Sequence, residues 1–210
     1  MSTPNLTRRA ALAALAVTGA LVLTACGGTG DDRGTGSGHA AHGASATPGT
    51  PAGAHNAQDV AFAQGMIPHH RQALEMARLA DGRASSARVE DLAARIEKAQ
   101  DPEIRTMTGW LKSWGEEAPM AGMDHSGHSG MPGMPGMMSD ADLTALKKTT
   151  GQDFDTRFLS LMVEHHRGAV KMAATEKEKG RYGAARTMAD AIVTTQNAEI
   201  KEMQQLLAGE

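Results

Sequence analysis

The chain contains the sequence FAQGMIPHHRQALEMA at residues 62–77 and the sequence FLSLMVEHHRGAVKMA at residues 158–173. The two stretches match at an offset of 96 residues, and the match continues without a gap through residues 93–111 and 189–207. Apolar residues recur in them at spacings of three and four, the period of an amphipathic helix. A duplicated two-helix unit must bury its apolar stripe against its twin, so both His-His pairs are expected to face one shared interior.

The periodicity predicts four long helices, over about residues 59–80, 86–114, 155–179 and 182–207, and a short one over about 139–149. Asp59 is the expected N-cap of the first helix, and Ser139 with Asp142 resembles a capping box for the short one. Pro102 is expected to kink or restart the second helix, because proline loses a hydrogen bond there. No stretch alternates with period two over a strand's length, so we expect an all-α antiparallel four-helix bundle made of two duplicated hairpins joined by a long crossover.

The first 56 residues predict export and a lipid anchor. Arg8 and Arg9 precede an uncharged run over residues 10–25 that is too short to span a bilayer comfortably, and that run ends at Cys26. The ending Leu-Thr-Ala-Cys resembles a bacterial lipobox, which implies a signal peptide over 1–25, lipidation of Cys26 and a position on the outer face of the cytoplasmic membrane. The twin arginines leave Sec and Tat export open. Residues 26–56 are rich in Gly, Ala, Ser, Thr, Pro and His and are expected to form a flexible tether.

The remaining chain is expected to be one bundle domain over residues 57–208. It divides into repeat one at 59–114, a linker at 115–152 and repeat two at 153–208. Cys26 is the only cysteine, so this domain has neither disulfides nor thiolate ligands, and any metal must be held by His, Met, Asp or Glu. A net charge of −3 and six aromatic residues argue against nucleic acid as a partner.

The two His pairs are candidates for a metal site. Adjacent helical residues point about 100° apart, so one histidine of each pair is expected to face inward and the other a neighbouring helix or solvent. A methionine one turn from a histidine places a thioether beside an imidazole, which suits copper. The candidate ligands of the bundle are Met66, His69, His70, Met76, Glu103 and Met107 in repeat one, and Met162, His165, His166, Met172, Glu199 and Met203 in repeat two.

A structural alternative stays open for these residues. The histidines could be satisfied by polar groups on the second helix of each hairpin, namely Gln100, Glu103, Gln196 and Glu199, and the methionines could fill the core.

The linker between the repeats is a second candidate site. Its methionines stand among glycines and prolines, where there is no core for them to fill. Met-x-x-Met spacing lets such a segment wrap thioethers around Cu(I), while the histidines suit Cu(II). The candidate ligands are Met120, Met123, His125, His128, Met131, Met134, Met137 and Met138. The alternative is a low-complexity spacer.

Three motifs carry a family resemblance: MIPHHxxAxxMA from Met66, QxxEIxxMxxWL from Gln100, and FLxxMVxHHxxAxxMA from Phe158. They resemble the bacterial domain-of-unknown-function family number 305 over residues 57–208. That resemblance implies a ferritin-like four-helix bundle that is often exported, with some members linked to copper binding. The second repeat departs from the first in having Leu206 in place of Trp110 and no counterpart to Pro68.

These observations favour a lipid-anchored, extracytoplasmic protein that binds copper and buffers or delivers it. No nucleophile with a base and no phosphate loop is readable, so no catalytic step is required. Delivery would need a copper-handling partner protein, and an aliphatic outer stripe would permit a homodimer. Two alternatives stay open: a ferritin-like iron or manganese oxidase or peroxidase, weakened by the lack of Glu-x-x-His at either pair, and a non-metal structural or interaction module.

Overall fold

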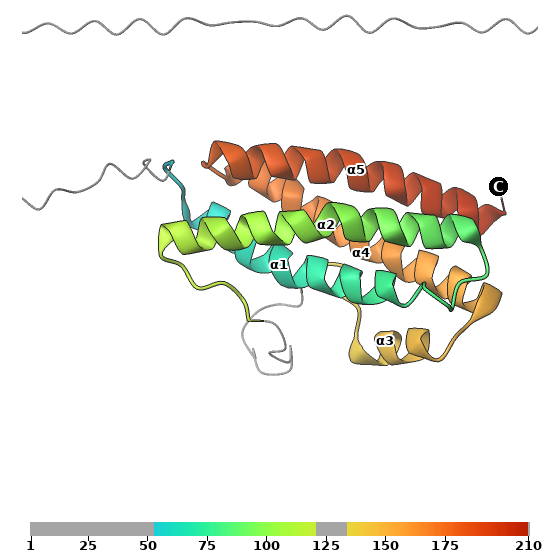
Figure 1. The fold of residues 1–210 in the computed structure, drawn as a ribbon. Helices are drawn as coiled ribbons and strands as arrows, with labels where there is room; N and C mark the ends of the chain where they lie inside the picture. The colour runs from blue at the N-terminus through green and yellow to red at the C-terminus, as the bar shows by residue number, and fades with distance from the viewer. Residues whose placement is uncertain (1–52, 121–133, 210) are drawn as a thin grey trace, which may run out of the picture. The chain divides into compact units, whose positions relative to one another are not determined.

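Five helices make up the part of the chain that the structure describes, residues 53–120 and 134–209 of a computed structural model. They are α1 (Ala57–Arg78), α2 (Ala87–Trp114), α3 (Asp140–Lys147), α4 (Gly151–Lys179) and α5 (Gly183–Ala208). Figure 1 shows the α1–α2 hairpin beside the α4–α5 hairpin, with the short α3 on the connection between them. The two hairpins pack through α1 and α4, so the predicted all-α bundle of duplicated hairpins is confirmed.

The first helix begins earlier than its pattern predicts. Asn56, not Asp59, is the N-cap, because its side-chain oxygen accepts from the backbone N–H groups of Gln58 and Asp59. Asp59 completes this capping box by accepting from the Asn56 N–H at 2.6 Å. The expected box of Ser139 and Asp142 at the start of α3 is present.

The second helix runs through Pro102 as one continuous helix, so of the two expected effects, a kink or a restart, the restart does not occur. A proline in a helix interior costs about 3 kcal/mol. Buried Ile96 lies on one side of it and buried Met107 and Leu111 lie on the other, so packing of both halves of α2 offsets that cost. Pro68 likewise lies inside a continuous α1.

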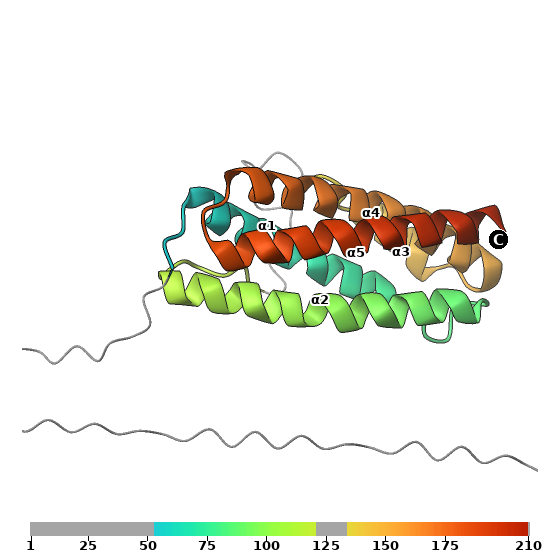
Figure 2. The same cartoon turned by 90° about the horizontal axis from the view of Figure 1, so that it is seen from above.

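Two equivalent aspartates fasten each hairpin to the other. Asp59 at the start of α1 accepts from the backbone N–H groups of Arg181 (3.0 Å) and Tyr182 (2.8 Å) in the α4–α5 turn. Asp155, which lies 96 residues later, accepts from the N–H groups of Ser85 and Ser86 in the α1–α2 turn. The start of each repeat therefore binds the turn of its twin, which fixes α1 antiparallel to α4. Figure 2 shows α1 and α4 running in opposite directions.

The core consists of two hydrophobic clusters with a polar layer between them. One cluster gathers the second halves of α1 and α5, the first halves of α2 and α4, and α3, around stacked Phe154 and Phe158. The other gathers the first halves of α1 and α5 with the second halves of α2 and α4, around Phe62 and Leu111. Every long helix crosses from one cluster to the other at its polar residues, so the layer lies at mid-length of the bundle.

None of the described helices is both long and apolar enough to cross a bilayer. The predicted signal peptide, Cys26 and all but the last residues of the tether lie outside the described residues.

Candidate metal centre

The polar layer contains the same four side chains from each repeat. Seven of the eight are buried, and Glu103 is partly buried. Its members are His69, His70, Gln100 and Glu103 from repeat one, and His165, His166, Gln196 and Glu199 from repeat two. A buried polar group without a hydrogen-bond partner costs about 1–3 kcal/mol, so the unpartnered groups of this layer lower the free energy of unfolding.

The outer histidine of each pair points to its own hairpin partner. His70 Nε2 donates to Glu103 Oε2 at 2.7 Å, and His166 Nε2 donates to Glu199 Oε2 at the same distance. The 100° separation of adjacent helical residues produces this divergence, and the second histidine in each pair faces a helix rather than solvent. The alternative in which polar partners satisfy the histidines therefore holds for these two Nε2 atoms.

The inner histidines face each other across the α1–α4 contact. The ring centroids of His69 and His165 lie 3.8 Å apart, with an angle of 39° between the planes. The two residues are 0 % and 1 % exposed. Within residues 53–120 and 134–209, neither ring nitrogen of His165 has a hydrogen-bond partner, and His69 has one only at Nε2, which donates to the carbonyl oxygen of Pro135 at 3.1 Å.

Both inner imidazoles are neutral at physiological pH. Burial, and then the charge of His70, lower the pKa of His69 to about 3. Burial, and then His69, hold the pKa of His165 well below its usual value. Since a carbonyl only accepts, the proton of His69 is on Nε2, and Nδ1 presents a buried lone pair. A neutral imidazole with a free lone pair is the form that binds metals.

Two methionine sulfurs lie beside Gly65, which is one helical turn before His69 on α1. A β-carbon at Gly65 would lie 3.8 Å from the Sδ atom of Met134 and 3.8 Å from the Sδ atom of Met172. The missing side chain at Gly65 thus leaves room for one thioether from α4 and one from the crossover. The equivalent of Gly65 in repeat two is Leu161, so this arrangement occurs at one of the two equivalent positions.

The other candidate ligands have different surroundings. Five helical methionines are fully buried within the two hydrophobic clusters, as core packing requires: Met66, Met76, Met107, Met162 and Met203. Met120 is 64 % exposed, while Met137 and Met138 are partly buried. Met123, His125, His128 and Met131 lie outside the described residues.

The described residues contain no group of three or more His, Cys, Asp and Glu side chains that could hold a metal ion. A site at the inner histidines would therefore need the thioethers of Met134 and Met172 as well as the imidazoles. Such a mixed set of soft sulfur and imidazole donors fits copper.

A short segment that we call the strap, residues 134–138, covers the inner histidines. Its Pro135 carbonyl accepts from His69, and its Met138 exchanges two hydrogen bonds with the side chain of Gln72, at 2.7 and 3.0 Å. On α4 the strap lies against Gly168, where a β-carbon would lie 1.9 Å from the Pro135 oxygen. Sequence reasoning did not find Gln72 or Gly168. They occupy equivalent positions 96 residues apart, so the replacement of a glutamine by a glycine between otherwise similar repeats could have indicated them.

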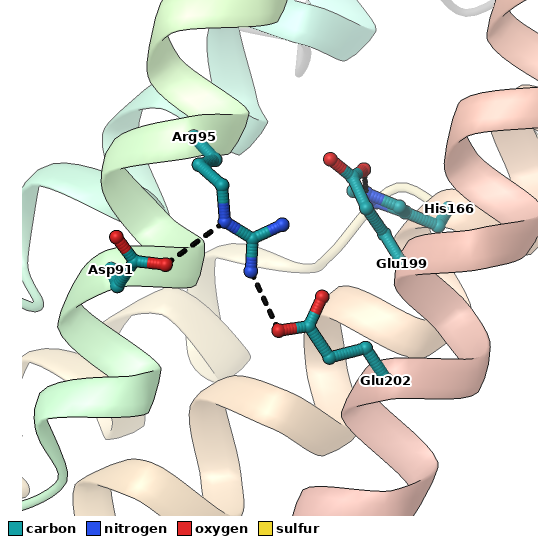
Figure 3. Close-up of polar contacts among 5 residues, drawn as sticks. All are labelled: Asp91, Arg95, His166, Glu199 and Glu202. Atoms are coloured by element: carbon teal, nitrogen blue, oxygen red, sulfur yellow. Dashed lines mark hydrogen bonds and ion pairs between the residues drawn. The ribbon is translucent and has the colours of Figure 1, made fainter. Parts of the chain in front are cut away.

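The two His–Glu pairs differ in their exposure to solvent. Figure 3 shows Arg95 of α2 between Asp91 on its own helix (3.0 Å) and Glu202 on α5 (2.6 Å), beside Glu199. The side chain of Glu199 is 9 % exposed, whereas that of Glu103 is 24 % exposed. The duplication has therefore produced two pairs with the same hydrogen bond and different access.

Fold and site together define a class of protein: a four-helix bundle of two duplicated hairpins with paired histidines in a buried polar layer. The chain belongs to the family described as the domain of unknown function DUF305, whose model matches residues 59–207. The resemblance seen in the sequence is thereby confirmed. None of the curated proteins matches the chain.

Solved structures of this family are similar to the chain. A DUF305 protein of Streptomyces coelicolor, described as a putative secreted protein, is 35% identical, with a TM-score of 0.65 over 72% of this chain and 93% of that one. A DUF305 fragment of Deinococcus radiodurans is 30% identical, with a TM-score of 0.64 over 74% and 98%. CopM in its Cu(II)-bound form is 35% identical, with a TM-score of 0.62 over 72% and 96%, and CopM is also solved with Cu(I) and with silver.

Proposed function

We propose that this protein binds copper outside the cytoplasm and buffers or delivers it. The observation that carries the proposal is His165: a neutral, buried imidazole with both nitrogens unpartnered, 3.8 Å from the ring of His69. Folding gains nothing from such a group, because an apolar side chain of similar volume would avoid its desolvation cost. A ligand that uses the lone pair supplies the reason for keeping it.

The ligand set of this proposal begins with His69, His165, Met134 and Met172. Neutral imidazole and thioether donors favour copper over magnesium or calcium, which take oxygen ligands. CopM, which is 35% identical to this chain in its Cu(II)-bound form, is solved with Cu(I), Cu(II) and silver, which supports the same class of ion here. The remaining candidate methionines and histidines of the crossover would capture the ion before it reaches the bundle.

The location in this proposal is the cell envelope, with the protein held by a lipid on Cys26. The lipobox-like sequence supports this, as does the similarity to a relative described as a putative secreted protein. Palmitate labelling of cells would test it: incorporation that Cys26→Ala abolishes is expected, and labelling that survives this substitution would contradict it.

The binding test is an anaerobic Cu(I) titration of the purified protein against a chromophoric chelator. We expect the double variant His69→Gln and His165→Gln to lose the tightest site. The matched control is His55→Gln, since His55 stacks on Trp114 at 4.5 Å, outside the polar layer. Unchanged affinity in the double variant would refute the assignment of these ligands.

Elemental analysis separates the alternatives. Iron or manganese bound to protein produced without added copper would favour the oxidase or peroxidase. Absence of any metal affinity, with thermal stability untouched by chelators, would favour an interaction module.

A further inference from the structure

We infer that the strap, residues 134–138, is a gate: it must lift from the inner histidines before copper can reach them, and it carries Met134 with it. This inference rests on the proposed function, since it concerns access to the same site. Four features of the described residues carry it.

The strap is hydrogen-bonded to His69 and covers the inner histidines. The Nε2–H of His69 donates to the Pro135 carbonyl oxygen, and His69 and His165 are buried. An ion approaching from the crossover side therefore meets the strap backbone first. Lifting the strap would free Nε2 of His69 and open the face of the ring pair.

Two glycines, one on α4 and one in the strap, let the strap backbone pack directly against the backbone of α4. Gly168 admits the Pro135 carbonyl, as described above. Gly136 has a φ of +79°, and a β-carbon on it would lie 2.6 Å from the carbonyl oxygen of Glu164. The left-handed conformation and the close approach both require glycine here. These contacts make the closed position specific.

A second side chain of α1, besides His69, binds the strap. Gln72 donates through Nε2 to the Met138 carbonyl oxygen and accepts from the Met138 N–H through Oε1. Gln72 and Gly168 each lie three residues after the inner histidine of their own helix. At this one pair of equivalent positions, repeat one has a glutamine that hydrogen-bonds the strap and repeat two has a glycine that leaves room for it.

The closed strap also completes the sulfur pair. Met134, its first residue, places Sδ beside Gly65, where the Sδ atom of Met172 also lies. Opening the strap would take Met134 away from Met172 and leave the histidines with one thioether fewer. The closed strap thus adds one thioether ligand to the site. We therefore expect copper to be released slowly from the closed state and to exchange rapidly in the open state.

The test is a pair of glycine-to-alanine variants in the whole protein. Gly168→Ala forces the strap off α4. Gly109→Ala is the matched control, because Gly109 is also helical and nothing lies within 4 Å of a β-carbon there. Gln72→Ala is the second variant, which removes the two hydrogen bonds to Met138 without adding bulk and keeps the test available should Gly168→Ala fail to fold.

Two readouts are compared among these proteins. The first is modification of His69 and His165 by diethyl pyrocarbonate, resolved by peptide mass spectrometry, which needs no metal. The second is the rate of Cu(I) transfer from a chromophoric chelator, followed anaerobically by stopped flow. We expect both rates to rise about tenfold or more in Gln72→Ala, because the strap loses two hydrogen bonds that hold it closed. We expect a similar rise in Gly168→Ala, because the added β-carbon excludes the Pro135 carbonyl from α4. Gly109→Ala should match the parent protein.

The possible results distinguish failure of the proposed gate from failure of the proposed copper binding. Histidine modification and Cu(I) transfer that match the parent in both strap variants, while hydrogen exchange shows the Met138 N–H released, would overturn the gate. A parent protein that takes up no Cu(I), yet shows faster histidine modification in the variants, would overturn the proposed function and leave the gate standing.

Discussion

Residue 176 shows how one substitution between the repeats changes the chemistry of a position. Glu176 is fully buried beside Asp59, whereas its equivalent in repeat one is the apolar Ala80. Burial, and then the neighbouring Asp59, raise the pKa of Glu176 to about 8. Burial opposes the charge on Asp59, but the side-chain hydrogen bond with Glu176 and the backbone N–H groups of Tyr182, Asn56 and Arg181 outweigh it and hold the pKa of Asp59 below its usual value. Asp59 keeps the charge and Glu176 keeps the proton.

This arrangement predicts an unusual pH dependence of stability. Between the ordinary glutamate pKa of 4.5 and about 8, the folded protein holds a proton that the unfolded chain has released, so the free energy of unfolding falls as pH rises through this window. We expect Glu176→Gln to remove this slope and to be more stable than the parent at pH 8 by about 1–3 kcal/mol. Urea unfolding at pH 5, 6.5 and 8 measures it.

Exposed Glu178 on the same helix gives the control, and Glu178→Gln should retain the slope of the parent. A parent protein whose stability rises between pH 5 and 8, with no difference in Glu176→Gln, would contradict the assignment of the buried proton.

At the scale of elements, the reciprocal aspartate caps decide how the hairpins assemble. Each cap joins the first helix of one repeat to the turn of the other, so it stabilises the packing of α1 on α4 rather than a single helix. Each aspartate accepts from two backbone N–H groups in the turn of the other hairpin, which would otherwise lack these acceptors. The duplication places the same device at both ends of the bundle.

We expect Asp155→Ala to lower the free energy of unfolding by about 2–4 kcal/mol, because it leaves the backbone N–H groups of Ser85 and Ser86 and the Ser85 hydroxyl without their acceptor. Chemical denaturation measures the loss. Asp153→Ala, an exposed carboxylate in the first turn of the same helix, should change stability by less than about 0.5 kcal/mol. Equal effects of the two substitutions would show that the cap adds nothing.

At the scale of the molecule, the polar layer divides the hydrophobic core, and the buried groups proposed to bind metal lower the stability of the metal-free fold. The layer interrupts apolar packing in all four long helices at the same level. Among the described residues, His165 has no hydrogen-bond partner at either ring nitrogen and His69 has none at Nδ1, while the outer histidines are paired to glutamates. Adjacent residues of α4 should therefore respond to the same substitution with opposite sign.

We expect His165→Leu to raise the free energy of unfolding of the metal-free protein by about 1–3 kcal/mol, because it removes two buried nitrogens without partners. His166→Leu should lower it by a similar amount, since it leaves the Glu199 carboxylate buried and unpaired. Thermal unfolding measures both, with shifts of about 2–4 °C per kcal/mol for a chain of this size. Destabilisation by His165→Leu would mean that its ring contributes packing that a leucine cannot replace.

The sequence alone determined the helices, the duplication and the inward direction of the histidine pairs. Helical periodicity reports which face of a helix a residue occupies, and the 96-residue offset showed that two such faces meet. The composition likewise restricted any metal ligands of the bundle to His, Met, Asp and Glu.

Only the tertiary structure decided the relations between segments that are distant in the sequence. The N-cap at Asn56, the reciprocal caps of Asp59 and Asp155, and the strap on Gln72 and Gly168 depend on which backbone groups packing brings within hydrogen-bond distance. A one-dimensional period contains no information about such contacts, because they arise from the antiparallel approach of α1 to α4 and the path of the crossover over them. That is why the histidines could be found in the sequence and the segment that covers them could not.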